Sequence, residues 1–224
     1  MDSINIIWPL SFVLLLASCT KEEPKKEVVS NDCAEKIWSV EGESGASTVK
    51  GLVRIHDGLL ELKVTPQSGM NSYLGVYQPA SLGVTGDFEV VVNYTNFESD
   101  DDSANYAMVG LYPSLMAFIS KKKTTLSAGI SGVINNKVDT VLGSSTNGYF
   151  KFKRTGNVAW VSTFVGGNEV FISHDSIGTG PMFLKITAFA GPNVSAPSTI
   201  FSVGSLKVTG SGLKSDEFDC NSIK

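Results

Sequence analysis

The sequence has few of the residues that build metal and redox sites. Its 224 residues include three cysteines and two histidines, and no two cysteines stand in a Cys-x-x-Cys spacing. A zinc ribbon or a histidine-rich metal centre needs more of these ligands, so the sequence excludes both. Basic residues are also scarce, with 18 Lys and Arg against 22 Asp and Glu. Nucleic acid is therefore not expected as a partner, because binding its phosphate backbone requires a dense basic face.

Helical periodicity and internal repeats are absent as well. Apolar residues occur in short runs with Gly, Pro, Asn and Asp between them, a pattern typical of strands and turns. The strand-like windows are 59–65, 87–97, 106–112, 115–121, 126–134, 149–154, 158–165, 182–189 and 200–209. This pattern predicts an all-β, two-sheet antiparallel β-sandwich, and the lack of a repeat argues against a propeller.

The N-terminal segment predicts a targeting signal. The apolar run from Ile4 to Leu16 is too short to span a bilayer and is typical of a signal-peptide core. It ends in Leu16-Ala17-Ser18-Cys19, which resembles the lipobox of bacterial lipoproteins. That resemblance implies a signal peptide over 1–18 and lipidation of Cys19. The alternative is an apolar core strand that carries a buried cysteine.

A charged segment follows the predicted lipidation site. Residues 19–32 are rich in Lys, Glu and Pro and predict a flexible tether between lipid and folded domain. Within it, Lys21-Glu22-Glu23 is similar to the surface-export signal of Bacteroidetes lipoproteins, which implies display at the cell surface from the outer membrane. The inner face of the outer membrane is the alternative, because the same string is also a generic hydrophilic linker.

The other two cysteines, Cys33 and Cys220, stand near the ends of the predicted folded domain, 33–224. They can pair in an oxidising compartment. A disulfide that closes so long a loop stabilises a protein by on the order of 4–5 kcal/mol in the chain-entropy model. Two unrelated buried thiols are the alternative.

A hairpin centred on Gly156 and Asn157 predicts a candidate ligand face. A two-residue turn fixes the register, with Lys153 opposite Trp160 and Lys151 opposite Ser162. One face then carries the apolar side chains of Phe150, Phe152, Val161 and Val165. The other face carries the candidate ligand-binding residues Tyr149, Lys151, Lys153, Trp160, Ser162 and Phe164.

This mixed face suits sugar binding, because rings stack on the C–H faces of a pyranose while its hydroxyls need polar partners. The alternative is that Trp160 and Phe164 are covered by a loop or by further strands, and that the lysines are only solvated.

Short motifs along the chain resemble a known superfamily. They are Gly-Leu-Leu-Glu-Leu at 58–62, Gly-Asp-Phe-Glu-Val at 86–90, Ala-Met-Val-Gly-Leu at 107–111, Phe-Lys-Phe-Lys-Arg-Thr-Gly-Asn at 150–157 and Phe-Ser-Val-Gly-Ser-Leu-Lys-Val at 201–208. Their order is similar to the concanavalin A-like lectin/glucanase superfamily, in particular its laminin-G-like and carbohydrate-binding jelly rolls. The opening Trp and closing amphipathic strand of those domains are similar to Trp38 and Leu206. The resemblance implies a jelly roll that binds glycans, in some members with calcium.

No catalytic residue is predicted. Retaining glycosidases need two carboxyl groups about 5–5.5 Å apart, and the expected Glu-x-Asp-x-x-Glu strand motif is absent. The dense acidic places, beside Gly or Ser, are interpreted as solvated turns: Glu41 with Glu43, and Asp100, Asp101 and Asp102. The latter three are also candidate calcium ligands, because calcium prefers carboxylate oxygens. No other cofactor is expected.

Two His-Asp neighbours, His56-Asp57 and His174-Asp175, are also interpreted as turn residues, since neighbours on a strand point to opposite faces.

Three functions remain compatible with the sequence. The first is a cell-surface lipoprotein with a non-catalytic carbohydrate-binding sandwich. The second is an adhesion or complex-forming module that meets a protein on the same fold. The third is a cryptic glycosidase or polysaccharide lyase, which requires a cleft with two carboxylates or an Arg/Lys/Tyr cluster assembled from separate strands.

Overall fold

The computed structural model describes residues 27–30, 39–44, 49–77, 83–99, 104–112, 117–131, 136–142, 145–165 and 167–211. Several sequence predictions lie outside these residues, namely those on Cys19, Cys33, Cys220, Trp38, Asp100, Asp101 and Asp102. In the described part of the chain every regular element is a strand, and no helix there is long and apolar enough to cross a membrane.

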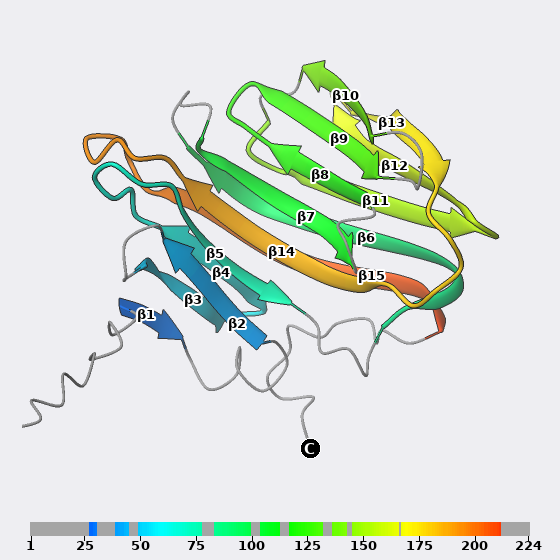
Figure 1. Ribbon diagram of the computed structural model, residues 1–224, viewed down its shortest axis with the longest axis horizontal. Coiled ribbons are helices and arrows are strands. Elements are labelled where there is room, and N and C mark those ends of the chain that lie inside the picture. The colour runs from blue at the N-terminus through cyan, green and yellow to red at the C-terminus, as the bar shows by residue number, and fades with distance from the viewer. Residues whose placement is uncertain are drawn as a thin grey trace, which may run out of the picture.

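The strands form two layers, which Figure 1 shows face on. The eight-stranded sheet has the order β1 (Glu27–Ser30), β3 (Lys50–His56), β4 (Leu59–Val64), β15 (Thr199–Ser211), β6 (Thr85–Glu98), β11 (Gly148–Thr155), β12 (Val158–Val165) and β13 (Asn168–Ser176). The seven-stranded sheet has the order β10 (Asn136–Leu142), β9 (Thr125–Ser131), β8 (Ala117–Lys121), β7 (Tyr106–Tyr112), β14 (Phe183–Ala190), β5 (Ser72–Tyr77) and β2 (Ser39–Ser44). Apart from the parallel β1–β3 pair, neighbouring strands are antiparallel, which confirms the predicted β-sandwich.

The core lies between the sheets and follows the two-residue period of the strands. In β14, Leu184, Ile186 and Ala188 are fully buried, whereas Phe183, Lys185 and Phe189 on the outer face are half-buried. Strand β6 shows the same alternation, with Val90 and Val92 pointing inward. Truncating such a buried Leu or Ile to Ala costs about 2–5 kcal/mol, so this alternation holds the two layers together.

The predicted hairpin is observed with its predicted register. Lys153 pairs with Trp160, and Lys151 pairs with Ser162. Gly156 takes a φ of 60°, a left-handed conformation that glycine adopts without a Cβ clash. Its N–H donates to Asp87 Oδ1 at 2.7 Å, which ties the turn to β6. Phe150, Phe152 and Val161 are fully buried and Val165 packs against the core, as the sequence predicts for that face.

Several segments interpreted otherwise from the sequence are strands. Glu41 and Glu43 were predicted in a solvated turn, but they lie in β2, which pairs with β5. His174 and Asp175 lie inside β13, whereas His56 ends β3 and Asp57 begins a turn.

Two further differences concern the predicted tether and the strands that the sequence did not predict. Strand β1 falls inside the segment expected to be a tether, and its pairing with β3 makes residues 27–30 part of the sheet. The strands that were not predicted are β1, β2, β3, β5, β10 and β13.

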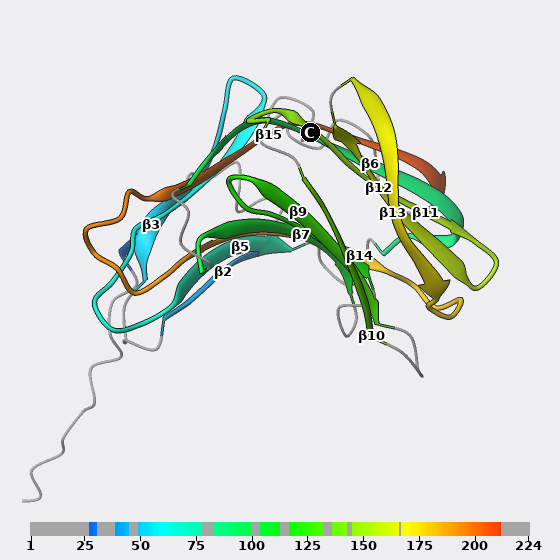
Figure 2. The same ribbon diagram turned by 90° about the horizontal axis from the view of Figure 1, so that it is seen from above.

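Both sheets curve in the same sense (Figure 2). The seven-stranded sheet lies on the inside of the curve, so its outer face is concave. The outer face of the eight-stranded sheet is convex. The molecule therefore presents two outer faces of opposite curvature, each with its own set of side chains.

Candidate functional site

An open groove lies on the convex face, over β11, β12 and β13. Its volume is about 460 Å³, within the range of small-molecule sites. We call it the Trp160 groove, and the residues that line it are Lys151, Lys153, Trp160, Ser162, Glu169 and Phe171.

Strand pairing brings these side chains to one face. Lys153, Trp160 and His174 form one cross-strand row, and Lys151, Ser162 and Phe171 form the next. A β-bulge between β12 and β13 shifts the register by one residue at Ser162. Bulges of this kind re-aim side chains, and this one lets both His174 and Phe171 oppose outward-facing residues of β12.

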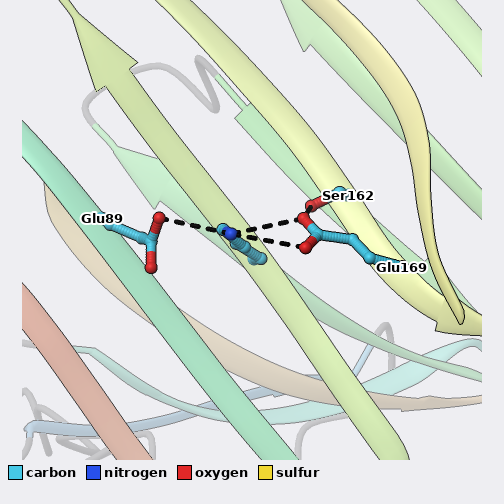
Figure 3. Close-up of polar contacts among 4 residues, drawn as sticks. Glu89, Ser162 and Glu169 are labelled. Carbon is cyan, nitrogen blue, oxygen red and sulfur yellow. Dashed lines mark hydrogen bonds and ion pairs between the residues drawn. The ribbon is translucent and has the colours of Figure 1, made fainter.

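One wall of the groove is an ion-pair network around Lys151. Its Nζ lies 3.3 Å from Glu89 Oε2 and 3.3 Å from Glu169 Oε1. Ser162 Oγ donates to the same Glu169 oxygen at 2.6 Å. Figure 3 shows Glu89 on one side of this network and Glu169, with Ser162 beside it, on the other side. The carboxylates come from β6 and β13, so the network joins two strands that flank the hairpin.

The network sets the charge states of its members. The Ser162 hydrogen bond, and then Lys151, lower the pKa of Glu169 despite an opposing effect of burial. Burial lowers the pKa of Lys151, but contacts with Glu89 and Glu169 outweigh it, so the net shift is upward. Burial and the neighbouring Glu169 carboxylate raise the pKa of Tyr149. At neutral pH the groove therefore holds an ionised Glu169 and a protonated Lys151.

The other wall of the groove is aromatic. Trp160 is half-buried, and among the described residues no ring stacks on it. Phe171 is 52% exposed and lies 5.5 Å from the His174 ring in a tilted arrangement. Trp160 and Phe171 thus offer apolar area to a ligand, beside fixed hydrogen-bonding groups.

The structure brings together four of the six residues predicted on this face: Lys151, Lys153, Trp160 and Ser162. The other two, Tyr149 and Phe164, pack on each other with ring centroids 5.4 Å apart. Sequence reasoning missed Glu89, Glu169 and Phe171. Glu169 and Phe171 stand on either side of Val170, so on a strand both would point to the same face. This signal was missed because 168–176 was not predicted as a strand.

A second aromatic surface, also missed, lies on the concave face. We call it the concave-face cluster, and it consists of Glu41, Tyr73, Tyr106, Tyr112, Lys185 and Phe189. Phe189 stacks on Tyr106 at 4.2 Å and tilts against Tyr73 at 5.5 Å. Lys185 Nζ lies 5.3 Å from the ring centroids of both Tyr73 and Tyr112 and pairs with Glu41.

Burial dominates the electrostatics of the concave-face cluster. It lowers the pKa of Lys185 and raises the pKa of Tyr106. Burial, together with the neighbouring Tyr106, also raises the pKa of Tyr112. Tyr106 and Tyr112 are therefore neutral at pH 7, and burial disfavours the charged form of Lys185.

Neither surface combines its charged groups into a metal centre. In the described ranges no three His, Cys, Asp or Glu side chains gather as ligands. In the groove the Lys151 ammonium already stands between the two carboxylates that a cation would need. Glu169 is a poor general acid, because its lowered pKa keeps it ionised where glycoside cleavage needs a proton donor.

Comparisons with known proteins place the fold. No family model and no curated protein matches this chain. The legume lectin-like domain from Entamoeba histolytica superposes with a TM-score of 0.51 at 14% identity, over 80% of this chain and 92% of that one. The exoplasmic/lumenal domain of VIP36, solved with Ca2+ and Man3GlcNAc, gives a TM-score of 0.50 at 10% identity, over 80% and 85%.

A family 7 alginate lyase solved with its product gives a TM-score of 0.50 at 12% identity, over 69% of this chain and 81% of that one. At these identities the likeness concerns the fold alone. Together with the two observed sheets, it shows that this domain has a concanavalin A-like jelly-roll fold, as the sequence resemblance implied.

Proposed function

We propose that this domain binds carbohydrate without cleaving it, and that the Trp160 groove is the binding site. One observation carries the proposal: an indole without a ring partner among the described residues lies beside fixed polar groups in an open groove. A pyranose stacks its apolar face on an aromatic ring while its hydroxyls bond to polar neighbours. The lectin-like neighbours, one of them solved with a bound mannose glycan, support the proposal at the level of the fold.

We further propose that Cys19 is lipidated and that the domain is held at the outer membrane, exposed at the cell surface. The sheet order supports this arrangement, because β1 and β13 lie at opposite ends of the eight-stranded sheet. With six strand spacings of about 4.8 Å between β1 and β12, the strand that carries Trp160, the groove lies roughly 30 Å from the N-terminal edge of the sheet. Mass spectrometry of the mature N-terminus tests this, and an unmodified Cys19 in a membrane extract contradicts it.

The same proposal includes a Cys33–Cys220 disulfide in the oxidising compartment. A free-thiol count on the denatured, unreduced mature protein tests it. We expect no reactive thiol from these two residues, whereas two reactive thiols would refute the bridge.

Calorimetry with a panel of oligosaccharides, chosen by a glycan array, tests the binding function. Because the ring supplies most of the apolar contact, Trp160→Ala is expected to weaken binding about 10- to 100-fold, or roughly 1–3 kcal/mol. The matched control is Tyr77→Ala, which removes an exposed aromatic side chain from the opposite sheet. Equal affinities for Trp160→Ala and the unsubstituted protein would place binding elsewhere.

Two other functions each have one observation in their favour. The exposed Phe171 beside Trp160 would suit a protein partner. An adhesion module would bind a protein and would bind no sugar on the glycan array.

The lysine and tyrosines of the concave-face cluster would suit a polysaccharide lyase. A lyase would release unsaturated oligosaccharides from a polymer and lose that activity in Lys185→Met.

A further inference from the structure

We infer that the Trp160 groove selects uncharged sugars and rejects acidic ones such as uronic acids. This inference rests on the carbohydrate-binding function proposed above and specifies the class of sugar. It follows from two features of the groove. Lys151 is already ion-paired with Glu89 and Glu169, and these carboxylates can still accept hydrogen bonds.

Among the described residues, the groove has no cation held ready for an acidic sugar. Lys151 contacts two carboxylates, Glu89 and Glu169, so a bound uronate would have to displace one of them. Lys153, the other cation in the lining, is exposed to solvent, where an ion pair is worth at most about 1 kcal/mol. The two carboxylates balance the two ammonium groups, so an added carboxylate gains no net attraction.

The capacity that remains is for accepting hydrogen bonds. An ionised carboxylate accepts only and has about four lone-pair sites. Ser162, Lys151 and Tyr149 use part of the capacity of Glu169 and hold the group in place. Its side chain is still 46% exposed, and that of Glu89 is 36% exposed. Sugar hydroxyls can donate hydrogen bonds to both Glu169 and Glu89, whereas the ionised carboxylate of an acidic sugar has no proton to donate.

The spacing of ring and acceptors fits a short neutral glycan. Ser162, which bonds to Glu169, follows Trp160 by two residues on β12, about 7 Å along the strand. A sugar ring placed on the indole therefore directs its rim hydroxyls toward Glu169. Phe171 flanks the next row, where an adjoining sugar unit would lie.

Paired oligosaccharides test the selectivity. Calorimetry would compare mannan hexamers with mannuronate hexamers, and glucan hexamers with glucuronate hexamers. We expect a neutral hexamer to bind and its acidic counterpart to bind at least about tenfold more weakly. The inference is overturned if an acidic hexamer binds as tightly as its neutral counterpart and Trp160→Ala abolishes that binding.

The variant Glu169→Gln keeps the shape of the side chain and removes its charge. We expect it to weaken neutral binding about tenfold and to narrow the gap between neutral and acidic sugars. Glu61→Gln, on β4 of the same sheet, is the control and is expected to change neither. If no sugar binds to any variant, the proposed function itself has failed, which is a different outcome from binding with the opposite selectivity.

Discussion

The two outer faces of this sandwich carry similar residues but use them differently. On the concave face, the rings of Tyr106 and Phe189 stack on each other, and Lys185 stands over two tyrosines and pairs with Glu41. On the convex face, Trp160 has no stacked ring among the described residues, and the nearby Glu169 is held by Ser162 and Lys151 while its side chain stays 46% exposed. Aromatic and charged residues on a sheet therefore do not mark a binding site by themselves. A binding site also needs aromatic rings and hydrogen-bonding groups that remain accessible to a ligand after the contacts within the protein are made.

The largest expected difference between the faces is in folding stability. Phe189→Ala removes a half-buried ring that packs on Tyr73 and Tyr106, so we expect the free energy of unfolding to fall by about 2–3 kcal/mol in urea titrations. Sugar binding should not change. Trp160→Ala is the reciprocal variant, with a stability change below about 1 kcal/mol. Equal destabilisation by both substitutions would remove the distinction between the faces.

A residue in the core between the two faces provides a reference for the stability measurements. The Tyr94 hydroxyl is buried without a hydrogen-bond partner among the described residues, and burial raises its pKa to about 12. Tyr94→Phe deletes this unsatisfied group, and we expect it to raise the free energy of unfolding by about 1 kcal/mol with binding unchanged. A loss of stability would show that the hydroxyl is bonded in solution, for example to water.

A smaller expected effect concerns the titration of the two lysines. Relative to an ordinary lysine, the pKa of Lys151 is raised by its two carboxylates against burial, while that of Lys185 is lowered by burial. Lys151 thus adds stability below about pH 10.5 that is lost as pH rises through its folded-state pKa. Lys185 costs stability below its folded-state pKa, and the cost is relieved as pH rises from there toward about 10.5.

Nuclear magnetic resonance of the two lysine side chains against pH measures this contrast. We expect Lys185 to titrate before Lys151, and Glu169→Gln to lower the midpoint of Lys151 without moving that of Lys185. Coincident midpoints would contradict the assigned environments.

Local features of the fold and of the groove could be predicted from the sequence. The turn at Gly156 fixes the pairing of Lys153 with Trp160, and alternation then separates core from ligand face. Glu89 could not be predicted at the groove, because β6 lies far from the hairpin in the chain and joins it only by sheet pairing. Glu169 and Phe171 were missed because the bulge in β13 breaks the alternation that identifies a strand.

On the concave face, too, contacts between strands distant in sequence could not be predicted. Glu41 lies beside Gly42, which suggested a turn, yet β2 pairs along its length with β5. Its ion pair with Lys185 depends on two strands, β2 and β14, that flank β5 on either side. Contacts made across a sheet by strands distant in sequence have no local signature, and the Lys185–Glu41 and Lys151–Glu89 pairs are both of this kind.

The measurement that tests this account most directly is to map a bound neutral oligosaccharide onto the two faces by nuclear magnetic resonance. We expect the largest chemical-shift changes at the Trp160 indole and at the backbone of Ser162 and Glu169, with Tyr73 and Phe189 unmoved. Changes centred on Tyr73, Tyr106 and Phe189, with the Trp160 indole unmoved, would contradict the central claim and assign binding to the concave face.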